Sequence, residues 1–373
     1  MKKKMVVFVS ILIFLILFPI LVYIIYTSVA LHFGGKPHKS EMAAQAMASV
    51  YEKGRFKNQN NVPVILPKIY RKILRMQFDN NPARIPESQL PSLKPTLSET
   101  DTGDGCSVIW LGHSSVLIRI DGHIILIDPV FSRRASPVSF IGPMSFEYAV
   151  PITADAIPYP DIILISHDHY DHLDYHTIKD YYSDVQTFIV PLGVKSHLVR
   201  WGIPEIRITE LDWWSEVIYK ETLIFTATPA QHFTGRRGQN NSTLWCSWVI
   251  KGQKRNIFFS GDSGYSTHFS EIGEKFGPFD IALVESGAYG AYWPYIHMIP
   301  EESVQAHIDL KGKVMLPIHW GKFNLAFHPW KEPIERISVK APEFNIVLAT
   351  PRPGEEIILG GAIPKIAWWK IID

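Results

Sequence analysis

The chain has 373 residues, with 37 basic and 36 acidic side chains, 46% hydrophobic residues and 20% charged residues. This length supplies a sizeable buried core for one large domain or two small ones. The balanced charge argues against a protein that binds nucleic acid or another polyanion. The low charge and high hydrophobic content argue against intrinsic disorder.

The N-terminal 35 residues differ from the rest of the chain. Three lysines at positions 2–4 precede a stretch, residues 5–35, that contains no Asp, Glu, Lys or Arg. Residues 5–26 are almost wholly apolar. As a helix they would rise roughly 33 Å, enough to cross a hydrocarbon core of about 30 Å. The sequence therefore predicts a single transmembrane helix in an uncleaved membrane anchor over residues 1–35.

Two other interpretations of this stretch fit less well. A secretory signal peptide could be cleaved at Ser28-Val29-Ala30, but the apolar region of a signal peptide runs to only about 15 residues. A buried core helix would show a polar face, and none interrupts the run. Lysines next to a membrane span tend to stay on the cytoplasmic side, so the three N-terminal lysines predict that the body lies on the extracytoplasmic side. Lys36 and Lys39, beyond the span, oppose that orientation.

The remainder divides into a connecting arm and one larger domain. Residues 36–100 are predicted to form the arm, with short helices over 41–51 and 68–78 followed by a proline-rich segment. In residues 101–373, short β-rich runs alternate with helical stretches, and Asp121-Gly122 predicts a hairpin. The predicted strands are 108–111, 116–120, 124–127, 161–166, 187–190, 206–209, 216–219, 223–228, 244–250, 256–259, 280–285, 314–317 and 346–349, and the predicted helices are 175–182, 194–201 and 301–310. This pattern predicts an α/β (α+β) fold in which two sheets pack together with helices outside.

The two cysteines, Cys106 and Cys246, lie far apart and show no C-x-x-C spacing. This spacing excludes a cysteine zinc site and a thioredoxin-type motif. We expect two small buried residues on strands, although an extracytoplasmic location would also permit a disulfide between them.

A dense group of metal-ligand side chains follows one buried strand. The apolar run 161–166 leads directly into His167-Asp-His-Tyr-Asp-His172. Imidazole and carboxylate are ligands that zinc prefers, whereas the alternative is a solvated loop that is rich in histidine by chance. The first two histidines, two apart, would point to the same side of an extended chain. The second aspartate and third histidine would turn the other way, so one loop could serve two adjacent metal ions.

Two metal sites need further ligands from elsewhere in the chain. His232, Asp262 and His319 each follow a predicted strand, and Gly261 permits a sharp turn before Asp262. Each of these residues alone would more often be an ordinary polar residue with a hydrogen-bond partner. Together they supply the additional ligands that the first loop lacks for two metal sites. An aspartate between two metals can bridge them, and we assign that role to Asp262.

The pattern His-x-His-x-Asp-His after a buried strand resembles the signature of the metallo-β-lactamase superfamily of binuclear zinc hydrolases. Further phrases resemble the branch that contains N-acyl-phosphatidylethanolamine-hydrolysing phospholipase D and the bacterial sugar-phosphate lactonases. The resemblance runs from about residue 82 to about residue 333 and leaves out the anchor. The phrases are Trp110-Leu-Gly-His-Ser-Ser115, Asp128-Pro-Val-Phe-Ser-Arg-Arg-Ala-Ser-Pro137, His169-Tyr-Asp-His-Leu173, Thr228-Pro-Ala-Gln-His232, Ser260-Gly-Asp-Ser-Gly-Tyr265 and Ile318-His-Trp-Gly321.

The resemblance implies a four-layer αββα sandwich with two Zn²⁺ per chain at one edge, between the sheets; iron or manganese could replace zinc. Asp128 resembles a carboxylate that orients a ligand histidine, with a plain turn residue as the alternative. By the family pattern, the first zinc is held by His167, His169 and His232. The second is held by Asp171, His172 and His319, and both share Asp262.

Five residues are candidates for contact with the substrate or the reacting groups. His297 matches a histidine of the phospholipase branch that would contact the phosphate or protonate the leaving oxygen, although it could simply be a helix-entry residue. Asp171 would help to position an attacking hydroxide held between the metals. Arg236 and Arg237 could attract a phosphate head group or form a solvated basic loop. Tyr170 is a further candidate contact.

These features predict a membrane-anchored zinc phosphodiesterase that hydrolyses N-acyl-phosphatidylethanolamine to N-acylethanolamine and phosphatidate. The alternatives are a lactonase or other phosphoester hydrolase with a small soluble substrate, and a non-catalytic metal-stabilised membrane protein. Expected partners are the phospholipid and the bilayer, with no nucleic acid, and relatives of the branch suggest a homodimer. Aromatic residues that could contact lipid or belong to the core are Trp213, Trp214, Tyr292, Trp293 and Tyr295.

Overall fold

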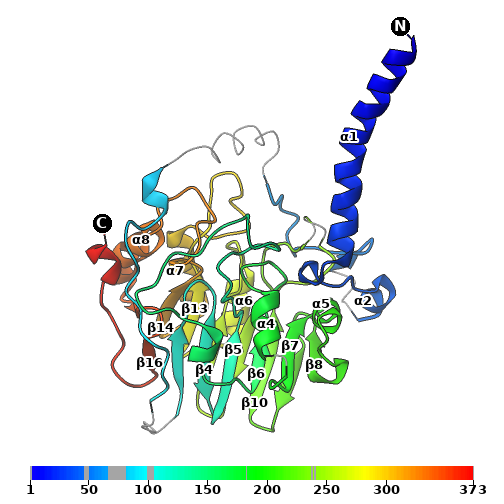
Figure 1. The fold of residues 1–373 in the computed structure, drawn as a ribbon. Coiled ribbons are helices and arrows are strands. Elements are labelled where there is room, and N and C mark those ends of the chain that lie inside the picture. The colour runs from blue at the N-terminus through cyan, green and yellow to red at the C-terminus, as the bar shows by residue number, and fades with distance from the viewer. Residues whose placement is uncertain are drawn as a thin grey trace.

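Two seven-stranded sheets lie face to face, and helices cover their outer faces (Figure 1). The computed structural model describes residues 2–45, 50–65, 81–98, 105–181, 183–236, 238 and 241–372. The arrangement is the predicted αββα sandwich, preceded by one long N-terminal helix.

The first sheet has the strand order β16-β3-β4-β5-β6-β7-β8. Strands β16 to β5 in this order pair antiparallel, and β5 to β8 pair parallel. Asp121 and Gly122 form the tight turn of the predicted hairpin between β4 and β5. The strands are β3 (Ser107–Trp110), β4 (Val116–Ile120), β5 (His123–Ile127), β6 (Ile162–Leu164), β7 (Thr187–Pro191), β8 (Ile208–Leu211) and β16 (Glu356–Ile358).

The second sheet has the order β15-β14-β13-β12-β11-β10-β9, antiparallel from β9 to β12 and parallel from β12 to β15. Residues 244–246, predicted as the start of β11, instead donate backbone hydrogen bonds to Leu192 and Ser166 beside the first sheet. The strands are β9 (Glu216–Tyr219), β10 (Leu223–Thr228), β11 (Ser247–Lys251), β12 (Asn256–Phe259), β13 (Ile281–Glu285), β14 (Val314–Ile318) and β15 (Val347–Leu348).

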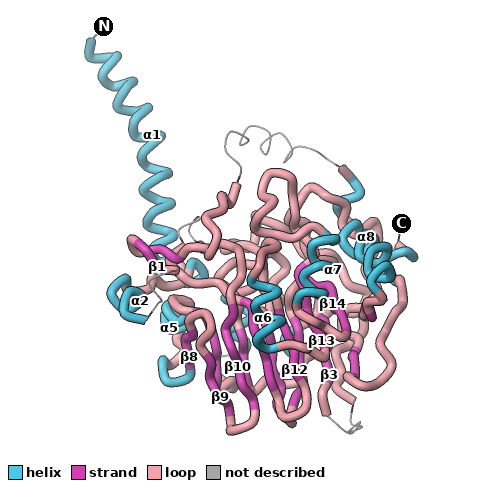
Figure 2. The backbone as a smooth tube through the Cα atoms, turned by 180° about the vertical axis from the view of Figure 1, so that it is seen from behind, coloured by secondary structure: helices cyan, strands magenta, loops and turns pink. Residues whose placement is uncertain are grey.

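Helices complete the outer layers (Figure 2). Apolar side chains of α4 (Tyr175–Tyr181) and α5 (Lys195–Arg200) pack on the first sheet. Those of α6 (His268–Phe276), α7 (Pro300–Asp309) and α8 (Glu332–Lys340) pack on the second. Short 3₁₀ turns are η1 (Leu31–Phe33), η2 (Pro82–Arg84), η3 (Ala154–Ala156), η4 (Glu205–Arg207), η5 (Ala341–Phe344) and η6 (Trp368–Ile371).

Strand β13 is an example of why the sequences of these strands are unbroken apolar runs. Ile281 and Leu283 belong to the core between the two sheets, while Ala282 and Val284 pack under the helices of the outer layer. Because successive side chains point to opposite faces and both faces are buried, every position from 281 to 284 is apolar.

The N-terminal helix α1 (Lys2–Val29) projects away from the body (Figures 1 and 2). Its segment Val7–Val29 is long and apolar enough to cross a membrane, and its most apolar window has no buried residue. This exposure weakly supports the predicted membrane anchor, because a core helix of a soluble protein would be mostly buried. The side of the membrane on which the body lies stays a prediction.

The connecting arm differs in part from its prediction. A helix was expected over residues 41–51, but α2 spans Lys39–Gln45, and Tyr51 already belongs to a small hairpin. This hairpin pairs β1 (Tyr51–Glu52) with β2 (Arg55–Phe56), and Gly54 at its turn has a φ of 78°. A turn-forming glycine in this position ends the helical pattern. The helix predicted over 68–78 lies outside the described residues.

Both cysteines are buried and free, so no disulfide joins them. Burial raises the pKa of the Cys106 thiol to about 12 and that of Cys246 well above its ordinary value. They are small buried residues, as predicted, but each lies one residue before a strand (β3 or β11) rather than on it.

Candidate metal centre

Four chain segments that leave strands meet at one edge of the sandwich. His167 follows β6, His232 follows β10, Asp262 follows β12 and His319 directly follows β14. The structure therefore brings together side chains that stand up to 152 positions apart in the sequence.

The first cluster contains the residues expected to hold the first metal. His169 Nδ1 lies 3.0 Å from His167 Nε2 and 3.2 Å from His232 Nε2. Together with Asp262, each residue offers one ligand atom, and these atoms all lie within 4.8 Å of one another. Such a convergence of three imidazoles and a carboxylate could hold a divalent cation.

The second cluster contains Asp171, His172 and His319, and it also includes His113, which the sequence analysis did not assign. His113 Nε2 lies 2.8 Å from Asp171 Oδ2, and His172 Nε2 lies 3.5 Å from the same oxygen. The buried imidazole of His113 thus fixes the position of the Asp171 carboxylate.

Asp262 lies between the two clusters, and its two carboxylate oxygens face different sides. Oδ2 lies 3.8 Å from His167 Nε2 and 3.7 Å from His232 Nε2. Oδ1 lies 3.1 Å from His172 Nε2 and 3.0 Å from His319 Nδ1. This is the geometry required of a carboxylate that bridges two metal ions.

The charges of the centre also favour cations. Burial opposes the ionisation of Asp262, but the imidazoles of His172 and His319 hold its pKa well below its usual range. Burial likewise opposes the protonation of His172, yet Asp262 and Asp171 raise its pKa well above its ordinary value. The two carboxylates therefore demand positive charge, which a divalent cation would supply in place of the proton.

Buried polar atoms without hydrogen-bond partners provide a further test of fit. Among the described residues, His172 Nε2, Asp262 Oδ1 and His319 Nε2 are buried and make no hydrogen bond of good geometry, although Asp262 Oδ1 lies 3.0 and 3.1 Å from two imidazole nitrogens. Leaving such a group unsatisfied costs about 1–3 kcal/mol. Coordination of a cation removes this cost, so the residues fit the divalent metals that the resemblance implied.

Asp128 supports the metal loop from behind. Its Oδ2 lies 2.7 Å from His172 Nδ1, and its Oδ1 accepts a hydrogen bond from the Ser166 backbone N–H at 2.7 Å. The Ser166 hydroxyl donates to Oδ2 at 2.5 Å. Asp128 is fully buried, so it holds the ligand histidine and the end of β6 together, as a plain turn residue would not.

His297 lies beside the metal ligands and is held by a buried carboxylate. Its Nδ1 lies 2.9 Å from Glu285 Oε2, while Glu285 Oε1 accepts a hydrogen bond from the Met298 N–H at 2.7 Å. Burial lowers the pKa of His297 to about 3, and burial followed by the charge of Asp262 raises the pKa of Glu285. The pair is therefore neutral overall, which leaves a hydrogen on Nε2 of His297 for donation.

Three of these residues have left-handed backbone conformations that non-glycine residues rarely adopt. The φ angles are 54° for His113, 42° for Asp128 and 65° for His319. Each such conformation costs on the order of 1–3 kcal/mol and persists where the surroundings hold it, most often at functional sites. The backbone N–H of His319 donates to the carbonyl of His113 at 2.9 Å, which ties two of the three together.

Two of the predicted substrate contacts form hydrogen bonds with the backbone in and around the metal loop. The buried guanidinium of Arg236 donates to the carbonyls of Asp168 at 2.9 Å and Leu173 at 2.7 Å. The Tyr170 hydroxyl donates to the carbonyl of Arg236 at 2.6 Å. Both side chains thus hydrogen-bond to the backbone around the metal loop, their contact with substrate stays a prediction, and Arg237 lies outside the described residues.

The aromatic residues considered for lipid contact divide between core and surface. Trp213 is buried between the sheets and donates from Nε1 to the Trp245 carbonyl at 2.6 Å, so a lipid contact for Trp213 is wrong. Trp214 stacks on Phe276. Tyr295 is 41% exposed and lies two residues before His297.

His113 and Glu285 are the residues that sequence reasoning missed. Glu285 ends β13, so the rule that polar residues at strand ends converge could have found it. His113 stands inside the phrase Trp110-Leu-Gly-His-Ser-Ser115. Its place depends on contacts with a residue 58 positions away, which no local pattern indicates.

Comparisons with known proteins agree with this geometry. Residues 123–320 match the family described as "Beta-lactamase superfamily domain". An uncharacterized protein of Mycobacterium tuberculosis is 41% identical over 290 residues, which cover 77% of each chain. A Caenorhabditis elegans protein named N-acyl-phosphatidylethanolamine-hydrolyzing phospholipase D 1 is 35% identical over 277 residues, 70% of this chain and 77% of the relative.

A solved structure gives the same fold. The isothiocyanate hydrolase from Delia radicum gut bacteria aligns with a TM-score of 0.54 at 16% identity, covering 68% of this chain and 98% of the hydrolase. At this sequence identity the structural similarity shows the fold alone. Taken with the family match over residues 123–320 and the named relatives, these findings place the chain in the metallo-β-lactamase superfamily of metal-dependent hydrolases.

Proposed function

We propose that the chain is a membrane-anchored binuclear zinc phosphodiesterase that hydrolyses N-acyl-phosphatidylethanolamine to N-acylethanolamine and phosphatidate. The two-metal part of this proposal rests on the position of Asp262. Its Oδ1 and Oδ2 face two different groups of imidazoles at 3.0 to 3.8 Å. Imidazole with carboxylate suits zinc, and iron and manganese accept the same donors.

Two observations support a lipid substrate. The relative from Caenorhabditis elegans is named for hydrolysis of N-acyl-phosphatidylethanolamine. In addition, apolar side chains are exposed on both sides of His297, with Tyr295 at 41% and Ile299 at 40%. Together with the exposed apolar helix α1, such side chains favour a substrate that is presented by a bilayer.

The chemistry divides between the cations and the chain. Two bound divalent cations lower the pKa of a water molecule and stabilise charge on the phosphoryl oxygens. Asp171, held by His113 at 2.8 Å, orients the attacking water as a hydrogen-bond acceptor. His297, held by Glu285, donates from Nε2 to a phosphoryl oxygen or to the leaving oxygen of the ethanolamine group.

The lysines at positions 2–4 and the span that follows favour a body on the extracytoplasmic side. A homodimer remains part of the proposal for the assembly. The side of the membrane is tested on the intact protein by the accessibility of a labelled body residue in sealed vesicles. The homodimer is tested by the mass of the protein–detergent complex.

A substrate panel with metal analysis tests the proposed activity. The purified full-length chain would be loaded with zinc, analysed for zinc per chain, and assayed on phospholipids, lactones and sugar phosphates. We expect two zinc ions per chain and release of N-acylethanolamine, which His169→Ala abolishes and His176→Ala, at an exposed histidine of α4, leaves unchanged. Hydrolysis of lactones or sugar phosphates alone would favour the small soluble substrate, and two zinc ions without any hydrolysis would favour a non-catalytic role.

A further inference from the structure

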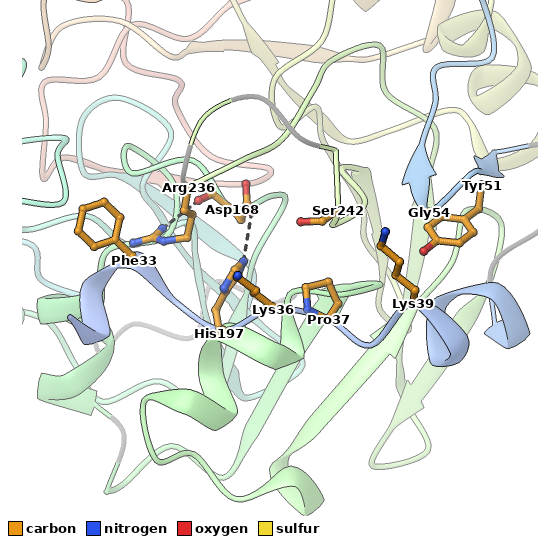
Figure 3. A pocket seen from close by; sticks show the side chains of 11 residues that line it. Phe33, Lys36, Pro37, Lys39, Tyr51, Gly54, Asp168, His197, Arg236 and Ser242 are labelled. Carbon is orange, nitrogen blue, oxygen red and sulfur yellow. Dashed lines mark hydrogen bonds and ion pairs between the residues drawn. The ribbon is translucent and has the colours of Figure 1, made fainter. Parts of the chain in front are cut away.

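A cavity lies where the N-terminal helix joins the body (Figure 3). It has a volume of about 170 Å³. Its lining comes from the segment after the anchor, the β1–β2 hairpin, the metal loop, α5 and the segment between β10 and β11. Polar and charged side chains of this lining are Lys36, Lys39, Tyr51, Asp168, His197, Arg236 and Ser242.

The cavity is separate from the metal centre although it shares the metal loop. The Asp168 carboxylate points away from the clusters and accepts hydrogen bonds from the Gly235 N–H at 2.9 Å and the Thr243 hydroxyl at 3.0 Å. His197 Nε2 lies 3.1 Å from the same carboxylate. Asp168 is thus fully engaged, and none of the proposed metal ligands lines the cavity.

The segment of residues 34–38, which we call the strap, is built into the wall of this cavity. Gly34 has a φ of +73°, and a Cβ there would lie 2.2 Å from His197 Nδ1. A Cβ on Gly35 would lie 1.9 Å from the Ser196 carbonyl oxygen. Only glycine permits this approach, so the pair fixes the strap on α5 and holds Lys36 at the cavity.

The end of the anchor is fixed just above the strap. Arg200 Nη2 donates to the carbonyls of Ser28 at 2.6 Å and Val29 at 3.0 Å. Arg236 Nη2 donates to the His32 carbonyl at 2.8 Å. The cavity therefore opens within a few residues of the end of the span, which is the level of the lipid head groups if α1 crosses a bilayer as proposed above.

The cavity has an excess of positive charge. Among the described side chains, Lys36 and Lys39 have no carboxylate within 4.0 Å, and both are exposed. Asp168 is the only carboxylate of the lining, and Arg236 lies beside it. Figure 3 shows Lys36 on the strap and Lys39 at the start of α2, with Tyr51 of the β1–β2 hairpin beside Lys39.

We propose that this cavity binds the phosphate group of an anionic phospholipid that is not the substrate. The lysines attract the phosphate, the Tyr51 hydroxyl donates a hydrogen bond to it, and the acyl chains lie against the exposed apolar side chains of α1. Juxtamembrane lysines strengthen binding to anionic lipid by about fivefold each. The proposal rests on the membrane anchor but not on the hydrolytic activity.

Lipid retention by the intact protein tests this site. The full-length chain in neutral detergent micelles would be mixed with phosphatidylglycerol or with phosphatidylcholine of the same acyl chains, and retained lipid would be counted by native mass spectrometry. We expect one phosphatidylglycerol to be retained in preference to phosphatidylcholine. The double variant Lys36→Gln/Lys39→Gln should bind it about 25-fold more weakly.

A matched control removes two exposed lysines elsewhere, Lys251→Gln/Lys311→Gln, and should bind like the original chain. Equal retention by the Lys36/Lys39 variant, or an equal loss in the control, would overturn the site. Displacement of the lipid by micromolar inorganic phosphate would assign the cavity to free phosphate instead. Because this experiment measures bound lipid, absence of hydrolysis would refute the proposed activity without refuting this site. A chain that leaves the micelle would refute the membrane anchor and the lipid site that depends on it.

Discussion

His172 Nδ1 lies 2.7 Å from Asp128 Oδ2, and this contact decides which nitrogen of His172 faces the metal centre. With Nδ1 bound to Asp128, Nε2 is directed at Asp262 Oδ1, 3.1 Å away. We predict that Asp128→Asn lowers zinc affinity about ten- to a hundredfold, because the support of a ligand histidine is lost. Competition with a chromophoric chelator measures the change.

The control for that variant is Asp174→Asn. Asp174 is also a buried carboxylate, but it accepts hydrogen bonds from Ser132 and Thr177 and contacts no metal ligand. Its substitution should leave zinc affinity unchanged even if stability falls. Equal loss of affinity in the two variants would mean that Asp128 acts only through general stability.

The pairing of His297 with Glu285 predicts unequal effects of three substitutions. His297→Ala should lower kcat about 10²- to 10⁴-fold, the usual contribution of a proton donor, with two zinc ions retained. Glu285→Ala should cause a similar loss. Glu285→Gln should stay within about tenfold of the original kcat, because its amide can donate to Nδ1 and its oxygen can still accept from the Met298 N–H. Loss of zinc in His297→Ala would make His297 a metal ligand instead.

Arg236 links the metal loop to the end of the anchor. Its guanidinium donates both to the Asp168 and Leu173 carbonyls and to the His32 carbonyl. Lysine cannot span these acceptors with one ammonium group, so Arg236→Lys should weaken zinc affinity several-fold. Arg200→Lys, which affects anchor contacts alone, should not, and zinc titration of both variants separates the two outcomes.

His268 predicts a loss of stability in acid that does not involve the metal ligands. Burial lowers its folded-state pKa to about 3, and its Nε2 lies 3.1 Å from the Ser263 hydroxyl. Below pH 6.5 the unfolded chain binds a proton that the folded chain refuses until about pH 3, so stability falls as pH falls through this window. The cost is about 1.4 kcal/mol per pH unit.

The variant His268→Gln keeps a hydrogen-bonding group and removes this titration. Guanidinium unfolding of the metal-free chain in detergent, at pH 7 and pH 5, should show the free energy of unfolding of the variant falling by about 2 kcal/mol less than that of the original chain. Parallel losses in the two proteins would show that His268 is not the group responsible.

Much of the fold could be predicted because hydrophobic runs and turn residues are local signals. Strands β4, β9, β10 and β12 begin and end where the sequence placed them. Helices α6 and α8 were not predicted, since nine-residue amphipathic helices leave a weak signal beside long apolar strands. The helix expected over 41–51 does not reach Tyr51, because Tyr51 pairs with Phe56 in a hairpin.

The metal centre was predictable where residue type and strand ends sufficed. The roles of His113 and Arg236 were not, because one depends on a left-handed backbone and the other on carbonyls from two distant segments. The division into residues 1–35, 36–100 and 101–373 stays a prediction.

The central claim is that water attacks phosphorus at a centre bridged by Asp262. It is tested most directly by hydrolysis of N-acyl-phosphatidylethanolamine in ¹⁸O-labelled water with the zinc-loaded full-length chain. We expect one ¹⁸O atom in phosphatidate, none in N-acylethanolamine, and no product from His169→Ala. Label in a released fatty acid or in N-acylethanolamine, or cleavage that persists in His169→Ala, would contradict it.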